Sequence, residues 1–291
     1  MADALVGRRG AVGERSELVK KPAWVIAKEK ARRAEGARTV WLFGLHAVRD
    51  ALENPRREAL RLVVTRNAAD KLAEPIARSG LMPELADPRR FPAPLDPGSV
   101  HQGAALEVRP LDWGPLRDVC LTGLSEASSE TVPAPLVVLL DRVTDPHNVG
   151  AILRSAEVFG ARAVIAPSRH AAPETGALAK AASGALERQP YLRVGNLGDA
   201  MLRLRDLGYA FIGLDGEAPE PIAAAASALP GPLGLVLGAE GPGLRARTRE
   251  TCDRLARIGP TGGFGSLNVS NAAAVALYAV QDQRRGARRS G

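Results

Sequence analysis

Leu136-Val137-Val138-Leu139-Leu140 is an unbroken run of apolar residues in the middle of the chain. A strand with one face in water alternates apolar and polar residues, whereas an unbroken run is typical of a strand buried on both faces of a sheet. Asp145-Pro146-His147-Asn148-Val149-Gly150 follows this run, and residues 151–160 have helical spacing. A buried strand followed by a helix is the repeating unit of a parallel sheet, so this stretch predicts a parallel α/β fold.

The same alternation continues toward the C-terminus and defines a domain over residues 135–285. Its further strands are expected at 163–166, 210–214, 233–237 and 255–258, and its further helices at 177–184, 197–208 and 268–284. Residues 39–110 predict a smaller α/β domain, with strands at 40–43, 60–64 and 104–108 and helices at 46–54 and 71–79. Residues 111–134 are rich in Gly, Pro, Ser and Glu, which favours a linker between the two domains.

The positive charge of the chain lies at its two ends. Residues 1–38 carry ten Lys and Arg against five Asp and Glu, and residues 281–291 carry four Arg against one Asp. The net charges of these two segments are +5 and +3. Because the whole chain has a net charge of +7, the remaining residues carry a net charge of −1. We expect 1–38 to be a basic arm that is disordered in isolation, and 286–291 to be a basic tail. Such segments suit a polyanion, because neutralising phosphates releases counterions, although a solubilising role is an alternative.

Several classes of protein are excluded by composition. Cys120 and Cys252 are too few for a disulfide framework, and the four histidines lack the spacing of metal ligands, so no metal is expected. No apolar run approaches the ~18 residues that cross a membrane. The first residues alternate charges and glycines without the apolar core of a signal peptide. The sequence therefore predicts a cytoplasmic protein that does not contact a membrane.

Three segments place small polar side chains and glycines where a strand gives way to a helix. The first contains Asn148, Gly150 and Arg154, and the second is Leu237-Gly238-Ala239-Glu240-Gly241. The third is Gly265-Ser266-Leu267-Asn268-Val269-Ser270-Asn271, which opens an otherwise apolar helix with four small polar side chains.

Each segment also has a purely structural interpretation when taken alone. Asn148 is well placed to cap the helix that follows it, and Arg154 could be a surface arginine. The second segment could be a tight turn, and the third an elaborate helix cap. The second segment has neither the glycine spacing of a dinucleotide-binding fingerprint nor the Lys-Ser/Thr of a P-loop, which argues against a nucleotide-binding oxidoreductase.

Taken in this order, the three segments resemble the motifs of the SpoU/TrmH family of RNA 2′-O-methyltransferases, whose members have a trefoil-knotted fold. The resemblance covers residues 136–284 and is strongest to the subfamily that methylates a guanosine ribose in large-subunit ribosomal RNA. Residues 44–48 and His101-Gln102-Gly103 resemble the substrate-binding domain that precedes the catalytic domain. One departure is Ile258-Gly259-Pro260-Thr261, where the family usually has Ile-Pro-Met.

The resemblance implies S-adenosylmethionine as the cofactor and guanosine of 23S ribosomal RNA as the substrate. It also implies a homodimer with the active site near the subunit interface, and it implies no DNA partner. Transfer RNA is the alternative substrate, and a non-catalytic RNA-binding protein of the same fold is the alternative class. The catalytic residues that it implies are Arg154, Asn148, Glu240, Ser266 and Asn268, and the cofactor-binding residues are Gly238, Ile258, Leu267, Leu237 and Gly241.

Arg154 is the central residue of that set. A guanidinium stays protonated at ordinary pH, which argues against a simple general base. A bidentate hold on the target phosphate, together with stabilisation of the developing alkoxide, is physically easier.

Overall fold

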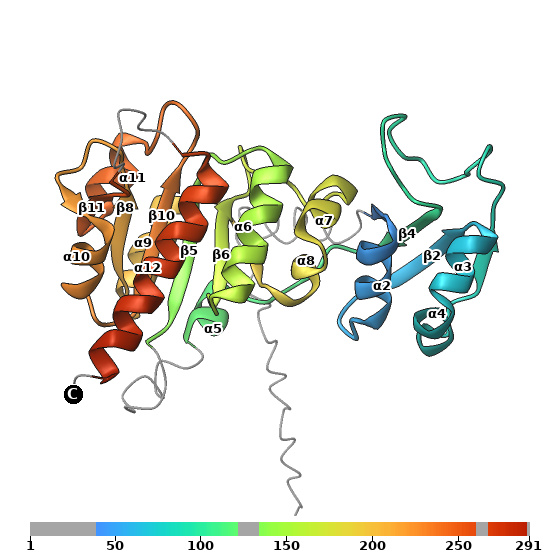
Figure 1. Cartoon of the computed structure of the whole chain (residues 1–291), viewed down its shortest axis with the longest axis horizontal. Helices are drawn as coiled ribbons and strands as arrows, with labels where there is room; N and C mark the ends of the chain where they lie inside the picture. Colours follow the sequence, from blue (N-terminus) through green and yellow to red (C-terminus); the bar gives the residue numbers. More distant parts are fainter. Residues whose placement is uncertain (1–38, 122–133, 260–266, 290–291) are drawn as a thin grey trace, which may run out of the picture. The chain divides into compact units, whose positions relative to one another are not determined.

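The computed structural model describes residues 39–121, 134–259 and 267–289, and the chain from Thr39 onward forms one compact unit (Figure 1). The basic arm expected at 1–38 lies outside the described residues. Two sheets organise the unit: one of four strands near its start and one of seven strands in the rest. No helix among the described residues is long and apolar enough to cross a membrane.

The four-stranded sheet confirms the expected small α/β arrangement and adds one strand to it. Its order is β1 (Val40–Phe43), β4 (Ala104–Val108), β2 (Ala59–Val64) and β3 (Pro83–Leu85). β4 is antiparallel to both β1 and β2, whereas β3 is parallel to β2. α2 (Leu45–Glu53) buries one apolar face, as its spacing predicted. The single helix expected at 71–79 is two helices, α3 (Arg66–Lys71) and α4 (Ala73–Ser79).

The seven-stranded sheet is parallel throughout, which confirms the fold class. Its order is β7 (Tyr191–Val194), β6 (Ala163–Pro167), β5 (Leu136–Asp141), β10 (Leu233–Gly238), β8 (Ala210–Leu214), β11 (Arg254–Arg257) and β9 (Glu220–Pro221). Its helices are α6 (Pro146–Val158), α7 (Gly176–Ala182), α8 (Ala185–Arg188), α9 (Leu197–Arg205), α10 (Ile222–Ser227), α11 (Ala246–Thr251) and α12 (Val269–Arg289). The strands β7 and β9 and the helices α8, α10 and α11 were not expected from the sequence. α12 runs to Arg289, so a helix occupies most of the expected basic tail.

The alternating side chains of β5 explain its unbroken apolar run. Val138 and Leu140 belong to a core with residues of α6 and α12, whereas Val137 and Leu139 belong to a second core with residues of α9. Figure 1 shows α6 and α12 side by side on the same face of the sheet. Both faces of β5 are therefore covered by helices, and none of its side chains needs to meet water.

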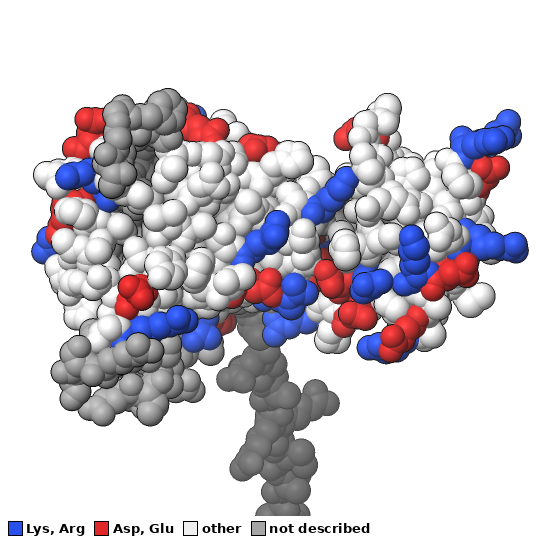
Figure 2. Space-filling model, viewed as in Figure 1, with Lys and Arg blue, Asp and Glu red and all other residues white. Residues whose placement is uncertain are grey.

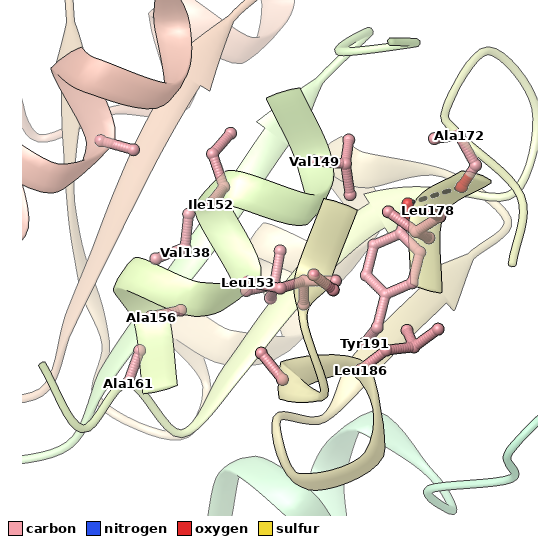
Figure 3. Packing of buried hydrophobic residues seen from close by; sticks show 14 of the residues in the cluster. Val138, Val149, Ile152, Leu153, Ala156, Ala161, Ala172, Leu178, Leu186 and Tyr191 are labelled. Atoms are coloured by element: carbon pink, nitrogen blue, oxygen red, sulfur yellow. Dashed lines mark hydrogen bonds between the residues drawn. The ribbon is translucent and has the colours of Figure 1, made fainter. Parts of the chain in front are cut away.

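Gly150 lets α6 and α7 cross at close range. A Cβ atom at this position would lie 2.6 Å from the Cβ of Ala181 and 2.8 Å from its carbonyl carbon, so any side chain would force the helices apart. Figure 3 shows the packing around this crossing, where Ile152 and Leu153 of α6 lie among buried side chains. Tyr191 closes this part of the core by donating a hydrogen bond of 2.8 Å to the carbonyl oxygen of Ala172. Gly150 is therefore required for the close packing of α6 against α7.

The segment expected to be a linker contains a helix, α5 (Leu116–Leu121), that packs on the large sheet's second core. Tyr209 donates a hydrogen bond of 2.9 Å from its hydroxyl to the carbonyl oxygen of Cys120. Burial raises the pKa of the Cys120 thiol to about 12, so it stays neutral at physiological pH. Part of 111–134 is thus an anchored element of the fold.

A buried ion-pair cluster links the loop after α2 to α8 of the larger sheet. The Arg57 side chain is fully buried and donates to both carboxylate oxygens of Glu187, at 3.0 Å from Nε and 2.6 Å from Nη2. Its Nη1 donates to Glu174 at 2.5 Å and to the carbonyl oxygen of Arg109 at 2.8 Å. Burial raises the pKa of Glu174, although Arg57 beside it acts in the opposite direction. Removing Arg57 would leave two buried carboxylates without their main donor.

We therefore expect Arg57→Ala to lower the free energy of unfolding by roughly 3–5 kcal/mol, because it breaks a buried pair and leaves the partner charge behind. Arg61→Ala is the matched control, because Arg61 pairs with Glu84 in a bridge whose two side chains are 44% and 46% exposed. That variant should lose less than about 1 kcal/mol. Urea denaturation of both variants measures the difference, and equal losses would contradict this account of the cluster.

Candidate active site

The parallel pairing of β5 with β10 brings the first two motif segments to one edge of the sheet. Asp141 at the end of β5 is in register with Gly238 at the end of β10. The chain leaves both strands at this level, toward α6 in one case and toward α11 in the other. The carboxyl ends of parallel strands are where ligand sites form in open α/β sheets, so this edge is the candidate site.

Asn148 is not the cap of α6, and the expectation that it caps the helix is wrong. Asp145 is the N-cap, with its carboxylate accepting hydrogen bonds from the amides of His147 at 3.1 Å and Asn148 at 3.2 Å. Because Asp145 satisfies these amides, the side chain of Asn148 is free for other partners. Asn148 is 9% exposed, and its amide points out of the first helical turn toward the second motif.

The second motif is a tight loop that folds back on the end of β10. The amide of Gly243 donates to the carbonyl oxygen of Ala239 at 3.0 Å, and Gly241 has a φ of +86°, which suits glycine. A Cβ at Gly238 would lie 2.2 Å from the carbonyl carbon of Gly243, so the returning backbone occupies the space of a side chain. This loop carries Glu240 at its turn.

One side chain from each motif meets in a hydrogen-bonded triangle. Asn148 donates from Nδ2 to Oε1 of Glu240 at 3.2 Å. Asn268 donates from Nδ2 to the same oxygen at 2.6 Å and to Oδ1 of Asn148 at 2.9 Å. The backbone amide of Val269 also approaches Oε1 of Glu240, at 3.4 Å. Glu240 is 92 residues and Asn268 120 residues from Asn148 in the sequence, and one carboxylate oxygen of Glu240 joins all three side chains.

Asn268 also starts α12. Its Oδ1 accepts hydrogen bonds from the Ser270 amide at 3.0 Å and from the Ser270 hydroxyl at 2.5 Å. An Asn that accepts from the second residue of a helix is acting as its N-cap. The amide group of Asn268 therefore stabilises the helix through its oxygen and contacts the other two motifs through its nitrogen.

The remaining predicted site residues lie around this triangle to different degrees. Leu237 is buried at the end of β10, Ile258 is half-buried after β11, and the Leu267 side chain is 51% exposed before α12. Arg154 is exposed on α6, and no side-chain partner is seen for it among the described residues. Ser266 lies outside the described residues. The structure thus brings together Asn148, Glu240 and Asn268, and it leaves Arg154 apart from them.

Neither cysteine has the character of a reactive thiol. Burial raises the pKa of Cys252 to about 12, as it does for Cys120. Within the described ranges, no three His, Cys, Asp or Glu side chains are grouped as metal ligands would be. The side chains that meet at this edge are two amides and a carboxylate.

Comparisons with known proteins agree with this geometry. The family described as the SpoU rRNA methylase family matches residues 135–278, and the family described as RNA 2′-O ribose methyltransferase substrate binding matches residues 41–113. The 23S rRNA (guanosine-2′-O-)-methyltransferase RlmB of Vibrio vulnificus is 38% identical over 250 residues, which cover 84% of this chain and 97% of that protein. The protein of the same name from Photobacterium profundum is 38% identical over 252 residues, covering 84% and 98%.

The chain belongs to the SpoU rRNA methylase family.

Solved structures place this SpoU family chain in the same fold. The SpoU methyltransferase AviRb from Streptomyces viridochromogenes, in complex with the cofactor AdoMet, superposes with a TM-score of 0.71 at 24% identity, covering 89% of this chain and 94% of that one. An AdoMet-bound rRNA methyltransferase from Sinorhizobium meliloti gives a TM-score of 0.68 at 23% identity, covering 87% and 90%. The trefoil-knotted fold that the resemblance predicted is therefore the fold of this chain.

Two residues of the site were missed from the sequence. Asp141 ends β5 with no exposed surface, and Arg245 donates to it from its backbone amide at 3.0 Å and from Nε at 2.6 Å. The available signal was an acidic residue that directly follows a buried apolar run. The partner stands 104 residues away, and no spacing rule connects the two.

We expect Glu240→Ala to lower the free energy of unfolding by about 0.5–1.5 kcal/mol, because Asn148, Asn268 and Val269 lose a shared acceptor that water replaces in part at this exposed position. Glu240→Gln keeps an oxygen in that place and should lose less stability than Glu240→Ala. Glu250→Ala is the control, since Glu250 is exposed on α11. Chemical denaturation measures all three, and a loss in Glu240→Ala no larger than in Glu250→Ala would show that the triangle does not stabilise the fold.

Proposed function

We propose that this chain transfers a methyl group from S-adenosylmethionine to the ribose 2′-hydroxyl of a guanosine in 23S ribosomal RNA. The observation that carries the proposal is the triangle of Asn148, Glu240 and Asn268, because it joins the three SpoU motifs at the carboxyl edge of the sheet. The RlmB relatives support the reaction and the substrate, since this chain covers nearly their whole length.

The residues at this edge fit the cofactor. Leu267 is exposed two residues before Val269, and Ile258 is half-buried after β11, which β8 separates from β10. These apolar side chains suit an adenine ring, and the open backbone of Gly241, where a Cβ would meet nothing within 4 Å, suits its polar edges. Leu237, Gly238 and Gly241 would contribute backbone contacts. When bound, the cofactor supplies a methyl group on a positively charged sulfur.

The side chains of this chain orient the acceptor. Asn148 and Asn268 hold each other through Glu240, so their amide groups are fixed in direction before any substrate binds. In this proposal they and Ser266 direct the ribose, whose hydroxyl oxygen must stand in line with the carbon–sulfur bond. The guanidinium of Arg154 holds the adjoining phosphate in this proposal and stabilises the negative charge that develops on the 2′-oxygen.

We propose that the chain forms a homodimer through the surface of α6 and α12. Val158 of α6 is 77% exposed, and Val275 and Tyr278 of α12 are 42% and 58% exposed. The ring of Tyr278 packs edge-on against Phe159, with 6.2 Å between the ring centres. Figure 2 shows few charged side chains over α12 and the adjoining α6. Neighbouring exposed apolar side chains of this kind mark an interface, and we assign this one to a second copy of the chain.

The proposed reaction is tested by incubating the protein with labelled S-adenosylmethionine and unmodified 23S ribosomal RNA and then mapping ribose methylation. We expect Arg154→Ala to lower kcat/KM by roughly 10²–10³, because a stabilising charge is lost from the transition state. The affinity of Arg154→Ala for the cofactor should change by less than about twofold. Arg203→Ala is the control, because Arg203 is an exposed arginine of α9, and both its kcat/KM and its cofactor affinity should change by less than about twofold.

The outcomes separate the alternatives. Methylation of transfer RNA but not of ribosomal RNA would show that transfer RNA is the substrate. Cofactor binding without methyl transfer to any RNA would favour a non-catalytic RNA-binding protein.

We expect Val275→Glu combined with Tyr278→Glu to convert the dimer to a monomer, because two charges cannot be buried in an apolar interface without partners. Leu202→Glu is the control, since Leu202 is 47% exposed on α9, which packs on the sheet's other core. Light scattering after size exclusion measures the molar mass. A monomeric unmodified protein, or a dimer that survives the double substitution, would overturn the assignment.

A further inference from the structure

Asp141 is a buried carboxylate whose hydrogen-bond donors, within the described part of the chain, come from Arg245. Its side chain has no exposed surface at the point where β5 ends. A buried carboxylate is costly unless donors surround it. Arg245 supplies a donor to each oxygen, from its backbone amide to Oδ2 at 3.0 Å and from Nε to Oδ1 at 2.6 Å.

The ion pair of Asp141 and Arg245 joins the two ends of the loop that carries Glu240. Asp141 is in register with Gly238, where the loop leaves β10, and Arg245 is the residue where the loop enters α11. The ion pair therefore ties the end of the loop to the strand beside its beginning. Between these points the loop is held by the hydrogen bond of Gly243 to Ala239.

The loop that ends at Arg245 also carries Glu240. The backbone of Gly243 fills the space beside Gly238, so the returning half of the loop rests directly on the strand end. Leu244 anchors that half by packing against the sheet's second core, and the ion pair of Arg245 with Asp141 adds the polar tie at its end. Glu240 lies between the two halves, and its Oε1 holds both Asn148 and Asn268.

We propose that Asp141 and Arg245 are positioning residues for the methyl transfer, and that their ion pair sets the loop 238–245 for cofactor binding. The proposal rests on the proposed function, because it takes this loop as the wall of the cofactor pocket. Neither residue touches the reacting atoms in this scheme. Both act through the position of Gly238, Gly241 and Glu240.

A merely structural salt bridge is the competing explanation, and α11 offers a matched control for it. Arg249 pairs with Asp215 from the same helix, with comparable exposure of the arginine side chain, 48% against 46% for Arg245. Among the described residues, the side chains of Arg249 and Asp215 make no hydrogen bond to the loop 238–245, and the backbone bond from the Arg249 amide to the Arg245 carbonyl oxygen is kept in an alanine variant. Arg249→Ala therefore removes the same side chain and the same type of pair without releasing Glu240.

The test compares Arg245→Ala, Arg245→Lys and Arg249→Ala in the full chain. Amide hydrogen exchange without cofactor should be about tenfold faster at Gly243 and Val269 in Arg245→Ala, and unchanged in Arg249→Ala. The dissociation constant for S-adenosylmethionine, measured by calorimetry, should rise about tenfold in Arg245→Ala only. Arg245→Lys keeps a cation that can reach Asp141, so its amide exchange and its cofactor affinity should lie between those of the unmodified protein and Arg245→Ala. This variant also allows the test if Arg245→Ala does not fold.

The outcomes separate this proposal from the proposed function. Unchanged exchange, unchanged affinity, or equal effects in Arg245→Ala and Arg249→Ala would each overturn the positioning role. Failure of the unmodified protein to methylate any RNA would overturn the proposed function, while exchange and cofactor affinity would still report on the ion pair.

Discussion

Six residues of β5 and six of β10 pair in parallel, and the site depends on this pairing. The two strands are far apart in the sequence, yet their last residues, Asp141 and Gly238, stand at the same level of the sheet. Only this register lets a side chain from the loop after β10 reach the first turn of α6. Because both strands are buried on both faces, polar groups can begin only where the strands end. The chemistry of the molecule is therefore confined to one edge.

At that edge the motif residues divide between packing and hydrogen bonding. Gly150 and Gly238 are glycines because another backbone occupies the place of their side chains. Asn148, Glu240 and Asn268 satisfy one another and also the start of α12. The glycines bring the segments close enough for the polar residues to meet. A loss in either group would disturb the same site by different physical routes.

The sequence predicted the elements whose burial leaves a pattern and missed those without one. The apolar runs of β5 and β10 and the spacing of α2 were sufficient, because continuous burial and one-sided burial have distinct periods. The two-residue strand β9 and the alanine-rich α10 carry no such period. Residue type alone did not decide which residue caps α6, because Asp145 and Asn148, three residues apart, are equally good candidates. The motifs indicated which residues matter, but their contacts depend on strand order, which no local pattern encodes.

The position of Arg154 on α6 is connected with the proposed dimer. Six residues separate it from Asn148 on α6, a rotation of about 240° about the helix axis. Arg154 is therefore on a different side of α6 from the amide that meets Glu240, and it is exposed there four residues before Val158. An arginine beside an apolar surface is suited to act across an interface, because its charge reaches past the buried contact. In the proposed dimer, a second copy on α6 and α12 would lie beside Arg154, so the proposed interface and the proposed catalytic arginine would share one surface.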